Sequence, residues 1–586
     1  MIREGLEFVS SIDPRLDINN LHNKQFAVLK SGNRQNFWQF PLQGTPGAVT
    51  QLNWNATVPD IKTYVNRRCY INLTGVLSFT GTSVDGVQPL LQCQGYAAAP
   101  GVDTGTQNFD SLRCLPMSQL FQSFTVTLNN NAITQNVGAY SRIFQRFQRT
   151  YQDQNVDLSM SPAMPDYSFS YADLNGTYLN PQGNYGDNQI DPRGAFTGVT
   201  VLTNTPTSAT VQFNITEPFW LSPFAWAKDD EPVSLLGIRN FNVAALLGGR
   251  GNSPIAGPAG SMWSHAQIAG QSGTITQGNL NITSGTLFLN YLSPSIAQSL
   301  PPKIYYSWVN PTYYQQTVPG VPSYPSSNSS IQQNSQTIQL NSNPSRIYVW
   351  VEKADSLQDM TQTDTFGFRI DKIAIRYDTV SSILNDCTPQ DLYQMSSRNG
   401  CNITWNQWNG TTCPTAFGGK KVTGVGSIMC INMGLDVPLP PGQAPGQEGK
   451  HTMQITVNAT NVSGVDYTGQ QLSVNVLVCE EGVMLNDNGT IQFSSGVIKE
   501  SDVLATAEMH PISHVPSKNV LGGSFWDDIK RFFIKAGPGV FRAVAPALPP
   551  LVGHVGEAVL QSYGKGGMHG KHKGGAVMSR KQLLLE

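Results

Sequence analysis

The stretch from Glu217 to Ala245, EPFWLSPFAWAKDDEPVSLLGIRNFNVAA, constrains the fold of this chain more than any other. Its aromatic residues stand in short groups because Pro218 and Pro223 interrupt them. Proline blocks a helix interior, so each apolar group is too short for a helix and suits a strand or the approach to one. The acidic run at 229–231 predicts a loop, after which the apolar pattern resumes. The stretch therefore predicts buried β-strands.

Alternation of apolar and polar residues recurs elsewhere in the chain. It is present at residues 70–79, 124–128, 453–457 and 472–478, with turn residues such as Asn129 to Asn131 between such segments. A period of two predicts half-buried strands, and strands separated by turns predict antiparallel sandwiches. With 586 residues, the chain is long enough for two large β units and a tail, or for about four average domains.

The composition indicates a surface of neutral polar residues. Charged residues make up 13% of the chain, about half the usual share for soluble domains. Asn, Gln, Ser and Thr must then supply the polarity of the surface. Together with 55 Gly and 37 Pro, this suits a protein of short strands and long loops that buries much of its outside against neighbours.

Two segments have the pattern of short helices. Residues 137–148 place four apolar side chains on one face: Tyr140, Ile143, Phe144 and Phe147. Arg142, Arg146 and Arg149 lie on the other face, where we expect either a solvated surface or a contact with nucleic acid. The second candidate is residues 389–395, with Pro389 suited to a first turn and Gly400 to a stop soon after.

The cysteines and the termini indicate which kind of cellular compartment suits this chain. Eight cysteines occur without a CxxC pair or a matching histidine spacing, which favours reduced, mostly buried thiols over a zinc site; we expect no metal and no cofactor. Cys401 and Cys413 are close enough to pair in an oxidising compartment. We find no signal-peptide core and no stretch near the roughly 18 apolar residues of a membrane span. N-x-S/T sequons are frequent, as expected by chance in a chain this rich in Asn, Ser and Thr.

The C-terminal tail predicts a short amphipathic helix. Ser524 to Asp527 fit a capping box, and Gly537-Pro538 ends the pattern. One apolar face is formed by Phe525, Trp526, Ile529, Phe532 and Phe533. From Lys518 onward, ten Lys and Arg stand against four Asp and Glu. Such a helix either lies in a membrane interface or docks against the protein itself, and the loose basic end beyond it can neutralise DNA phosphates without specificity.

Ordered motifs in both halves resemble one protein family. Besides the stretch at 217–245, the first half contains RLDINN at 15–20 and LPMSQLFQSFTVTLNNNAI at 115–133. The second half contains IYVWV at 347–351, TDTFGFRIDKIAIRYD at 363–378, TPQDLYQMSSRNG at 388–400 and SIMCINMGLDVPLPPGQAPG at 427–446. In this order they resemble the double-jelly-roll, hexon-like major capsid proteins of virophages and of polinton-like or adintovirus-like DNA viruses.

The resemblance implies an all-β fold of two consecutive eight-stranded antiparallel jelly rolls with few short helices. The domains expected are an N-terminal arm at 1–24, a first jelly roll at 25–255, a connecting region at 256–300, a second jelly roll at 301–505 and the basic tail at 506–586. It also implies a protein without an active site, assembled inside the host cell. Copies would trimerise into pseudo-hexagonal capsomers, and these would tile an icosahedral virion shell with penton or minor capsid proteins as partners.

The tail also resembles the membrane-active internal proteins of adenovirus-like viruses. A viral cysteine protease frees those proteins after an aliphatic residue, any residue, and Gly-Gly. Val520-Leu521-Gly522-Gly523 comes close to this pattern, although Val stands where Leu, Ile or Met is usual. The resemblance implies cleavage between Gly523 and Ser524, which would release residues 524–586.

Three other interpretations remain open. A secreted or surface β-sandwich could bind glycans through exposed aromatics, namely Trp405, Trp408, Tyr313 and Tyr314. Scattered carboxylates, namely Asp364, Asp371 and Asp378, could supply a glycosidase pair, although carboxylates at strand ends are usually loop residues. A single-jelly-roll vertex protein needs only about half of this length. No HExxH, GxSxG or phosphate-loop pattern occurs, and the sequence favours a structural protein over an enzyme.

Overall fold

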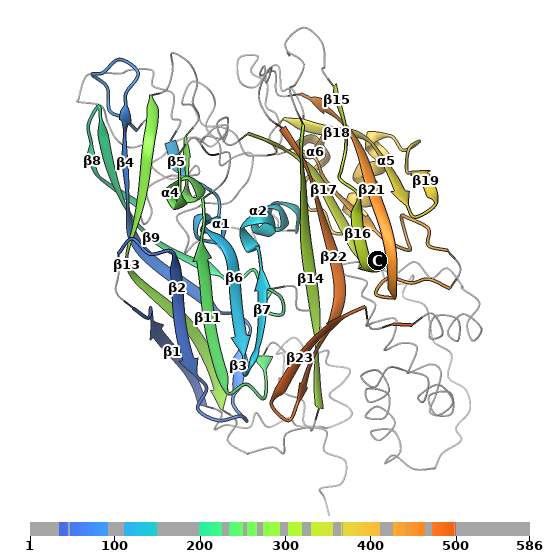
Figure 1. The fold of residues 1–586 in the computed structure, drawn as a ribbon, viewed down its shortest axis with the longest axis horizontal. Coiled ribbons are helices and arrows are strands. Elements are labelled where there is room, and N and C mark those ends of the chain that lie inside the picture. The colour runs from blue at the N-terminus through green and yellow to red at the C-terminus, as the bar shows by residue number, and fades with distance from the viewer. Residues whose placement is uncertain are drawn as a thin grey trace, which may run out of the picture.

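The structure, a computed structural model, describes residues 34–499 with internal gaps. The gaps are 45–46, 92–109, 149–198, 226–233, 250–252, 254, 266–272, 294–302, 319–329, 355–364, 366, 411–425, 441, 463–471 and 497. Four of the five β-sheets described in this part of the chain stand side by side (Figure 1). They form two sandwiches, and an inner sheet of each faces the other sandwich.

The first sandwich consists of a seven-stranded and a four-stranded sheet, and a two-stranded sheet of β5 and β12 lies beside them. The first outer sheet has the order β10-β3-β13-β4-β9-β8, and β1 pairs with β13. The first inner sheet has the order β2-β11-β6-β7. The strands are β1 (Arg34–Pro41), β2 (Gln51–Thr57), β3 (Tyr64–Asn66), β4 (Tyr70–Thr82), β5 (Asp110–Leu112), β6 (Phe121–Leu128), β7 (Asn131–Gln135), β8 (Val199–Asn204), β9 (Ser208–Pro218), β10 (Ser234–Leu235), β11 (Asn240–Leu247), β12 (Trp263–His265) and β13 (Thr274–Ser293). Its helices are α1 (Pro116–Leu120), α2 (Val137–Gln148) and α4 (Pro258–Met262).

The second sandwich consists of two five-stranded sheets. The second inner sheet has the order β14-β22-β17-β20, and β23 pairs with β22. The second outer sheet has the order β15-β21-β18-β19, and β16 pairs with β21. The strands are β14 (Lys303–Val318), β15 (Ser330–Asn334), β16 (Ile338–Ser342), β17 (Arg346–Lys353), β18 (Phe368–Tyr377), β19 (Val380–Ile383), β20 (Ile428–Asn432), β21 (Glu448–Asn461), β22 (Leu472–Asp487) and β23 (Thr490–Ser495). Its helices are α5 (Pro389–Arg398) and α6 (Trp405–Asn409).

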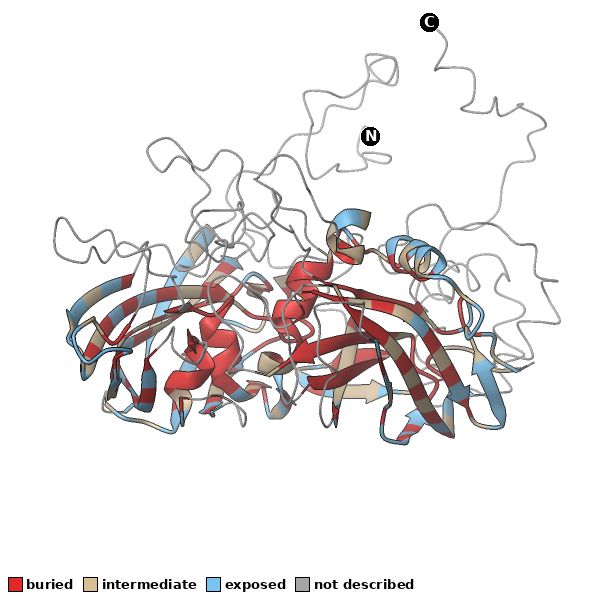
Figure 2. Cartoon of the chain, turned by 90° about the horizontal axis from the view of Figure 1, so that it is seen from above, coloured by how far each residue is buried: buried red, intermediate tan, exposed pale blue. Residues whose placement is uncertain are grey.

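The predicted alternation corresponds to real strands. The four segments singled out lie in β4, β6, β21 and β22. In β4 the buried and half-buried residues alternate along most of the strand, as a sheet with one face on a core requires. β22 differs because most of its residues are buried on both faces. Figure 2 shows buried residues inside each sandwich and also in the middle of the molecule, where the two sandwiches meet.

The two predicted helices are also present. The helix expected at 137–148 is α2, and the one expected at 389–395 is α5, which extends to Arg398. Thr388 caps α5 through a capping box with Asp391, so the helix begins where its first free amides find acceptors. Gly400, expected as a stop, has a φ of 100° just after the helix.

The region expected as a connection at 256–300 is corrected in its described part. It contains α4, β12 and the long strand β13, which pairs with β4 inside the first outer sheet. Register shifts near Ile275 and Ile282 break the alternation of β13. Its outward residues are mostly Thr, Asn and Ser, a composition that resembles a loop. β15 and β16 lie in the stretch at 319–345, whose high content of Pro, Ser, Gln and Asn is likewise typical of a loop.

Candidate functional site: the seam between the two sandwiches

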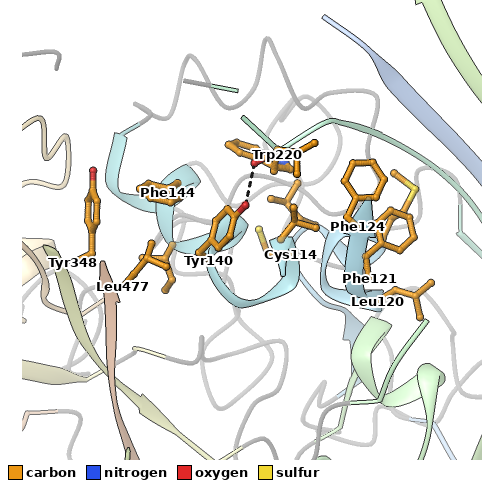
Figure 3. Packing of buried hydrophobic residues seen from close by; sticks show 14 of the residues in the cluster. Cys114, Leu120, Phe121, Phe124, Tyr140, Phe144, Trp220, Tyr348 and Leu477 are labelled. Carbon is orange, nitrogen blue, oxygen red and sulfur yellow. Dashed lines mark hydrogen bonds between the residues drawn. The ribbon is translucent and has the colours of Figure 1, made fainter. Parts of the chain in front are cut away.

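The two sandwiches meet along a seam, formed by α2 of the first sandwich and by the second inner sheet on which it lies. The rings of Phe144 and Phe147 both meet the Tyr348 ring edge-on, with centroids 4.8 and 5.3 Å away. Figure 3 shows Phe144 and Tyr140 lying between Tyr348 and Trp220. Buried edge-to-face pairs of this kind add about 0.5–1.5 kcal/mol each beyond the area they bury. The apolar face of α2 thus joins the cores of both sandwiches.

A buried ion pair crosses the seam. Arg142 Nη2 lies 2.8 Å from Glu352 Oε2, and the two side chains are 4% and 5% exposed. Arg142 also donates to the carbonyls of Gly138 and Ala139 at 2.8 and 2.9 Å, which holds the guanidinium against its own helix. Asn475 Nδ2 donates to the same carboxylate oxygen at 3.3 Å. Buried charges are tolerated when they are paired and hydrogen-bonded in this way.

The expectation for the arginines of α2 is therefore corrected. Arg142 and Arg146 are buried at the seam, where Arg146 donates to Thr365, and neither presents a solvated face or a surface for nucleic acid. Arg149 lies outside the described residues. The helical period correctly separated an apolar face from a basic one. It could not show that the second sandwich covers the basic face as well.

Polar side chains close the rest of the seam by bonding to backbone groups of the opposite sandwich. Among the strands that the structure describes, β14 pairs with β22 alone, and its other edge has no strand beside it. At Val309 the first sandwich occupies this edge: Gln135 donates to its carbonyl at 3.1 Å and Ser222 accepts from its amide at 2.9 Å. Further bonds across the seam join Leu236 to Tyr306, Asn486 to Leu236, Asn129 to Gly489 and Asn131 to Ile491. The open edge of β14 is thereby satisfied within the chain at Val309.

A pocket of about 260 Å³ opens beside the ion pair. Its walls come from both sandwiches and are largely polar, and Arg142 and Glu352 belong to them. A water molecule takes up about 30 Å³ of liquid, so the space suits a cluster of waters. Among the residues that the structure describes, no group of three or more His, Cys, Asp and Glu is placed to hold a metal ion.

Glu217, the first residue of the opening stretch, is fully buried and joins β9 to α1. Its carboxylate accepts from the amides of Met117 and Ser118 at 2.8 and 2.9 Å and from the Ser118 hydroxyl at 2.6 Å. Burial raises the pKa of Glu217 from its ordinary 4.5 to about 7, although these three donors favour the charged form. Since α1 packs against α2, Glu217 indirectly helps to hold α2 in its position at the seam.

Two functional residues were missed from the sequence, and for one of them a signal existed. Glu217 alternates with Phe213 and Ile215 along β9, which places all three on the inward face. A carboxylate at an inward position needs buried hydrogen-bond donors. The alternation along β9 therefore identifies Glu217 as a residue with buried partners. Glu352 carried no such signal, because its partner Arg142 is distant in the sequence.

The predicted tail sites lie outside the described residues. This applies to the cleavage residues Gly522, Gly523 and Ser524 and to the helix residues Phe525, Trp526, Ile529, Phe532 and Phe533. Within the described ranges, no helix combines the length and apolar character needed to cross a membrane.

The aromatic residues proposed for glycan binding do not form an exposed platform, which corrects that alternative. Trp408 is fully buried and donates to the Ile428 carbonyl at 3.1 Å. Trp405 is half-buried and stacks on Trp408, with ring centroids 5.9 Å apart. Tyr313 packs on Trp350 and donates to Asn475 at 2.7 Å, and Tyr314 is half-buried.

The carboxylates considered for glycosidase chemistry have separate partners. Asp371 pairs with Arg369 at 2.6 Å, and Asp378 pairs with His451 at 2.8 Å. Asp364 lies outside the described residues. Cys401 is a buried free thiol, and the other cysteines in the described ranges are free thiols too. Cys413, its possible disulfide partner, is not among the described residues.

Comparison with known families gives matches in both halves of the chain. Residues 6–292 match the family described as the Sputnik virophage major capsid protein 1st domain. Residues 312–482 match the family described as the major capsid protein V20 C-terminal domain. Capsid protein V20 of Sputnik virophage is 27% identical to this chain, over 99% of this chain and 97% of that protein.

Solved structures agree with these matches in fold. The chain in the 3.5 Å cryo-EM structure of Sputnik virophage superimposes with a TM-score of 0.68 at 23% identity, covering 90% of this chain and 98% of that one. The mavirus major capsid protein superimposes with a TM-score of 0.59 at 14% identity, covering 88% of this chain and all of that one. Each sandwich described above is thus a jelly roll.

Proposed function

This chain belongs to the double-jelly-roll major capsid proteins of virophages, and we propose that three copies form a pseudo-hexagonal capsomer that tiles an icosahedral shell. It is a structural protein of the virion capsid. Its relatives are capsid proteins, and we propose that it has no enzymatic activity. The surface area that it buries against neighbouring copies does the work of a shell protein.

The observation that carries the proposal is the set of contacts across the seam between the two sandwiches. Two similar sandwiches held rigidly side by side give one chain two lobes, and three such chains around an axis give six. A six-sided unit fills a shell with few kinds of contact. Aromatic packing, the Arg142–Glu352 ion pair and the occupied edge of β14 all oppose rotation of one sandwich against the other.

Electron microscopy and native mass spectrometry of the full-length chain, expressed in a reducing cytosol, test this proposal. We expect trimers with six lobes in projection, and larger closed shells at high concentration. A chain that stays monomeric at every concentration would contradict the proposal. A folded protein with only one jelly roll would contradict it as well.

For the tail we propose cleavage between Gly523 and Ser524 by a viral cysteine protease. The support is the sequence Val520 to Gly523, followed by the capping box and the aromatic face at 525–533. The released peptide would bind a membrane interface or the inner side of the capsomer, with weak nonspecific DNA contact through its basic end. Penton or minor capsid proteins would complete the shell. Mass spectrometry of mature particles should detect residues 524–586 as a separate peptide, and intact chains alone would disprove the cleavage.

A further inference from the structure

The first outer sheet is almost free of charge. In the seven strands that the structure describes for it, the charged residues are Arg34, the first residue of β1, and Glu217, which is buried and bonded to α1. Its outward face therefore has no formal charge over most of its extent. Charged residues are depleted at the centre of protein interfaces, whereas an ordinary solvent-exposed surface mixes both signs.

Asn, Gln, Ser and Thr line this outward face and bond to one another. Asn72 Nδ2 donates to Asn214 Oδ1 at 2.6 Å and to Thr216 Oγ1 at 2.9 Å. These bonds cross from β4 to β9. Polar groups that already have hydrogen-bond partners within the sheet incur a smaller desolvation free energy when a neighbouring protein displaces water. The sequons at Asn72 and Asn214 thus coincide with outward positions of two strands.

The edge of this face at β1 carries exposed apolar side chains. Phe37 is 77% exposed and Leu292 is 37% exposed. Phe37 lies opposite Asn290, and Gln35 lies opposite Leu292, so all four side chains share one face. β1 pairs with β13 without a register shift, whereas β8 at the far edge has one. A regular, nearly uncharged edge strand is the kind that pairs readily with another chain.

The second outer sheet provides an internal comparison. Its strands contain six charged residues, namely Arg369, Asp371, Lys372, Arg376, Glu448 and Lys450. Its short edge strand β19 has a register shift in its pairing with β18. Bulges and charge are the common means of keeping a sheet edge free of other chains. One chain therefore carries two outer sheets of opposite character.

The size of the uncharged face fits a protein partner. Five strands about 4.8 Å apart and about ten residues long, at about 3.4 Å per residue, cover roughly 800 Å². A stable interface of standard size buries ~800 Å² on each partner. The face is thus large enough to hold a partner without help from the loops.

We propose that the outward face of the first outer sheet is a contact surface for a second copy of this chain. The proposal rests on the self-assembly proposed above and specifies which surface takes part in it. The partner surface must also be poor in charge, because an Arg or Lys pressed against neutral groups would lose its hydration without gaining a counter-charge. The second outer sheet therefore does not qualify as that surface.

Matched substitutions on the two outer sheets test this. Gln212 is exposed on β9 and Gln332 is exposed on β15, and each lies on the outward face of its sheet. We expect Gln212→Lys to raise the protein concentration at half-assembly at least about tenfold, since an unpaired charge would be buried. Gln332→Lys should leave it near the wild-type value. Asn281→Asp, which adds a charge of opposite sign on β13 with almost no change of volume, should act like Gln212→Lys.

Sedimentation at a series of concentrations gives the assembly curves, and thermal midpoints close to wild type confirm that each variant is folded. If the wild type assembles and Gln212→Lys and Asn281→Asp assemble equally well, the inference about this face is wrong while self-assembly stands. If the wild type never associates, the proposed function fails first. Glycans found at Asn72, Asn214 or Asn281 would also overturn the inference, because they would block the face.

Discussion

The seam and the first outer face satisfy their polar groups by opposite means. At the seam, a nearly buried arginine and glutamate meet beside aromatic rings packed edge to face. On the first outer face, neutral amides and hydroxyls bond to one another and the strands carry almost no charge. The first sandwich takes part in both surfaces, which lie on either side of its core.

The difference follows from when each surface loses its water. The seam forms as the chain folds, so the partner of each charge is always present and the ion pair never exists as two separate buried charges. A surface used in assembly must be compatible with water before contact, and its hydrogen-bonding groups must have partners after contact. Neutral groups that bond within their own sheet meet both requirements. Surface chemistry thus distinguishes a permanent internal interface from one that forms later.

The largest expected effect comes from removing one member of the ion pair. Glu352→Leu leaves the Arg142 guanidinium buried beside an apolar side chain and should lower the free energy of unfolding by about 3–5 kcal/mol. The double variant Arg142→Met, Glu352→Leu should recover a large part of this loss, because it leaves no buried charge behind. Chemical denaturation of the three proteins measures both values.

A partly exposed ion pair serves as the control. Asp371→Leu in the second outer sheet removes the carboxylate that pairs with Arg369, where both side chains are about a quarter exposed. We expect a loss of about 1 kcal/mol or less there. Equal losses at Glu352 and Asp371 would show that burial at the seam does not strengthen the dependence of Arg142 on its partner.

A smaller, pH-dependent effect is expected at Glu217. Its folded pKa of about 7 lies above the ordinary 4.5, so its stabilising contribution is fully present below about pH 4.5 and is lost as the pH rises through about 7. A difference of this size corresponds to roughly 3 kcal/mol. Glu217→Gln keeps an acceptor oxygen for the α1 amides and should flatten the fall in stability between pH 4.5 and 7.

Denaturation at several pH values measures this slope, and the exposed Glu448 provides the control. Glu448→Gln should leave the wild-type slope in place. A slope that survives in Glu217→Gln would assign the pH dependence to another group.

The smallest effect is expected on the first outer face itself. Asn214→Ala removes the acceptor for Asn72 and should cost about 1 kcal/mol in the free energy of unfolding, the usual worth of one hydrogen bond. Gln212→Ala on the same strand should change stability by less than about 0.5 kcal/mol, as most surface substitutions do. A loss of several kcal/mol at either position would indicate that this face already supports the folded chain and is not reserved for a partner.

Local patterns in the sequence were enough to find most of the fold. The alternation in β4, β6, β21 and β22 and the helical period of α2 each follow from contacts between neighbouring residues, which is why they could be predicted. β13 could not be found because two register shifts break its period and its outward residues look like those of a loop. The candidate site was predicted less well, since the seam joins residues some 200 positions apart, such as Arg142 and Glu352.

The sequence by itself determined that this chain is a β protein of neutral polar surface with two sandwich-forming halves, because alternation and composition are properties of short segments. Only the tertiary structure decided which surfaces are covered. It buried the basic face of α2 against the second sandwich and aligned the uncharged positions of seven strands into one face. Burial depends on what lies across from a residue in space, and strand pairing brings together segments that the linear order keeps apart.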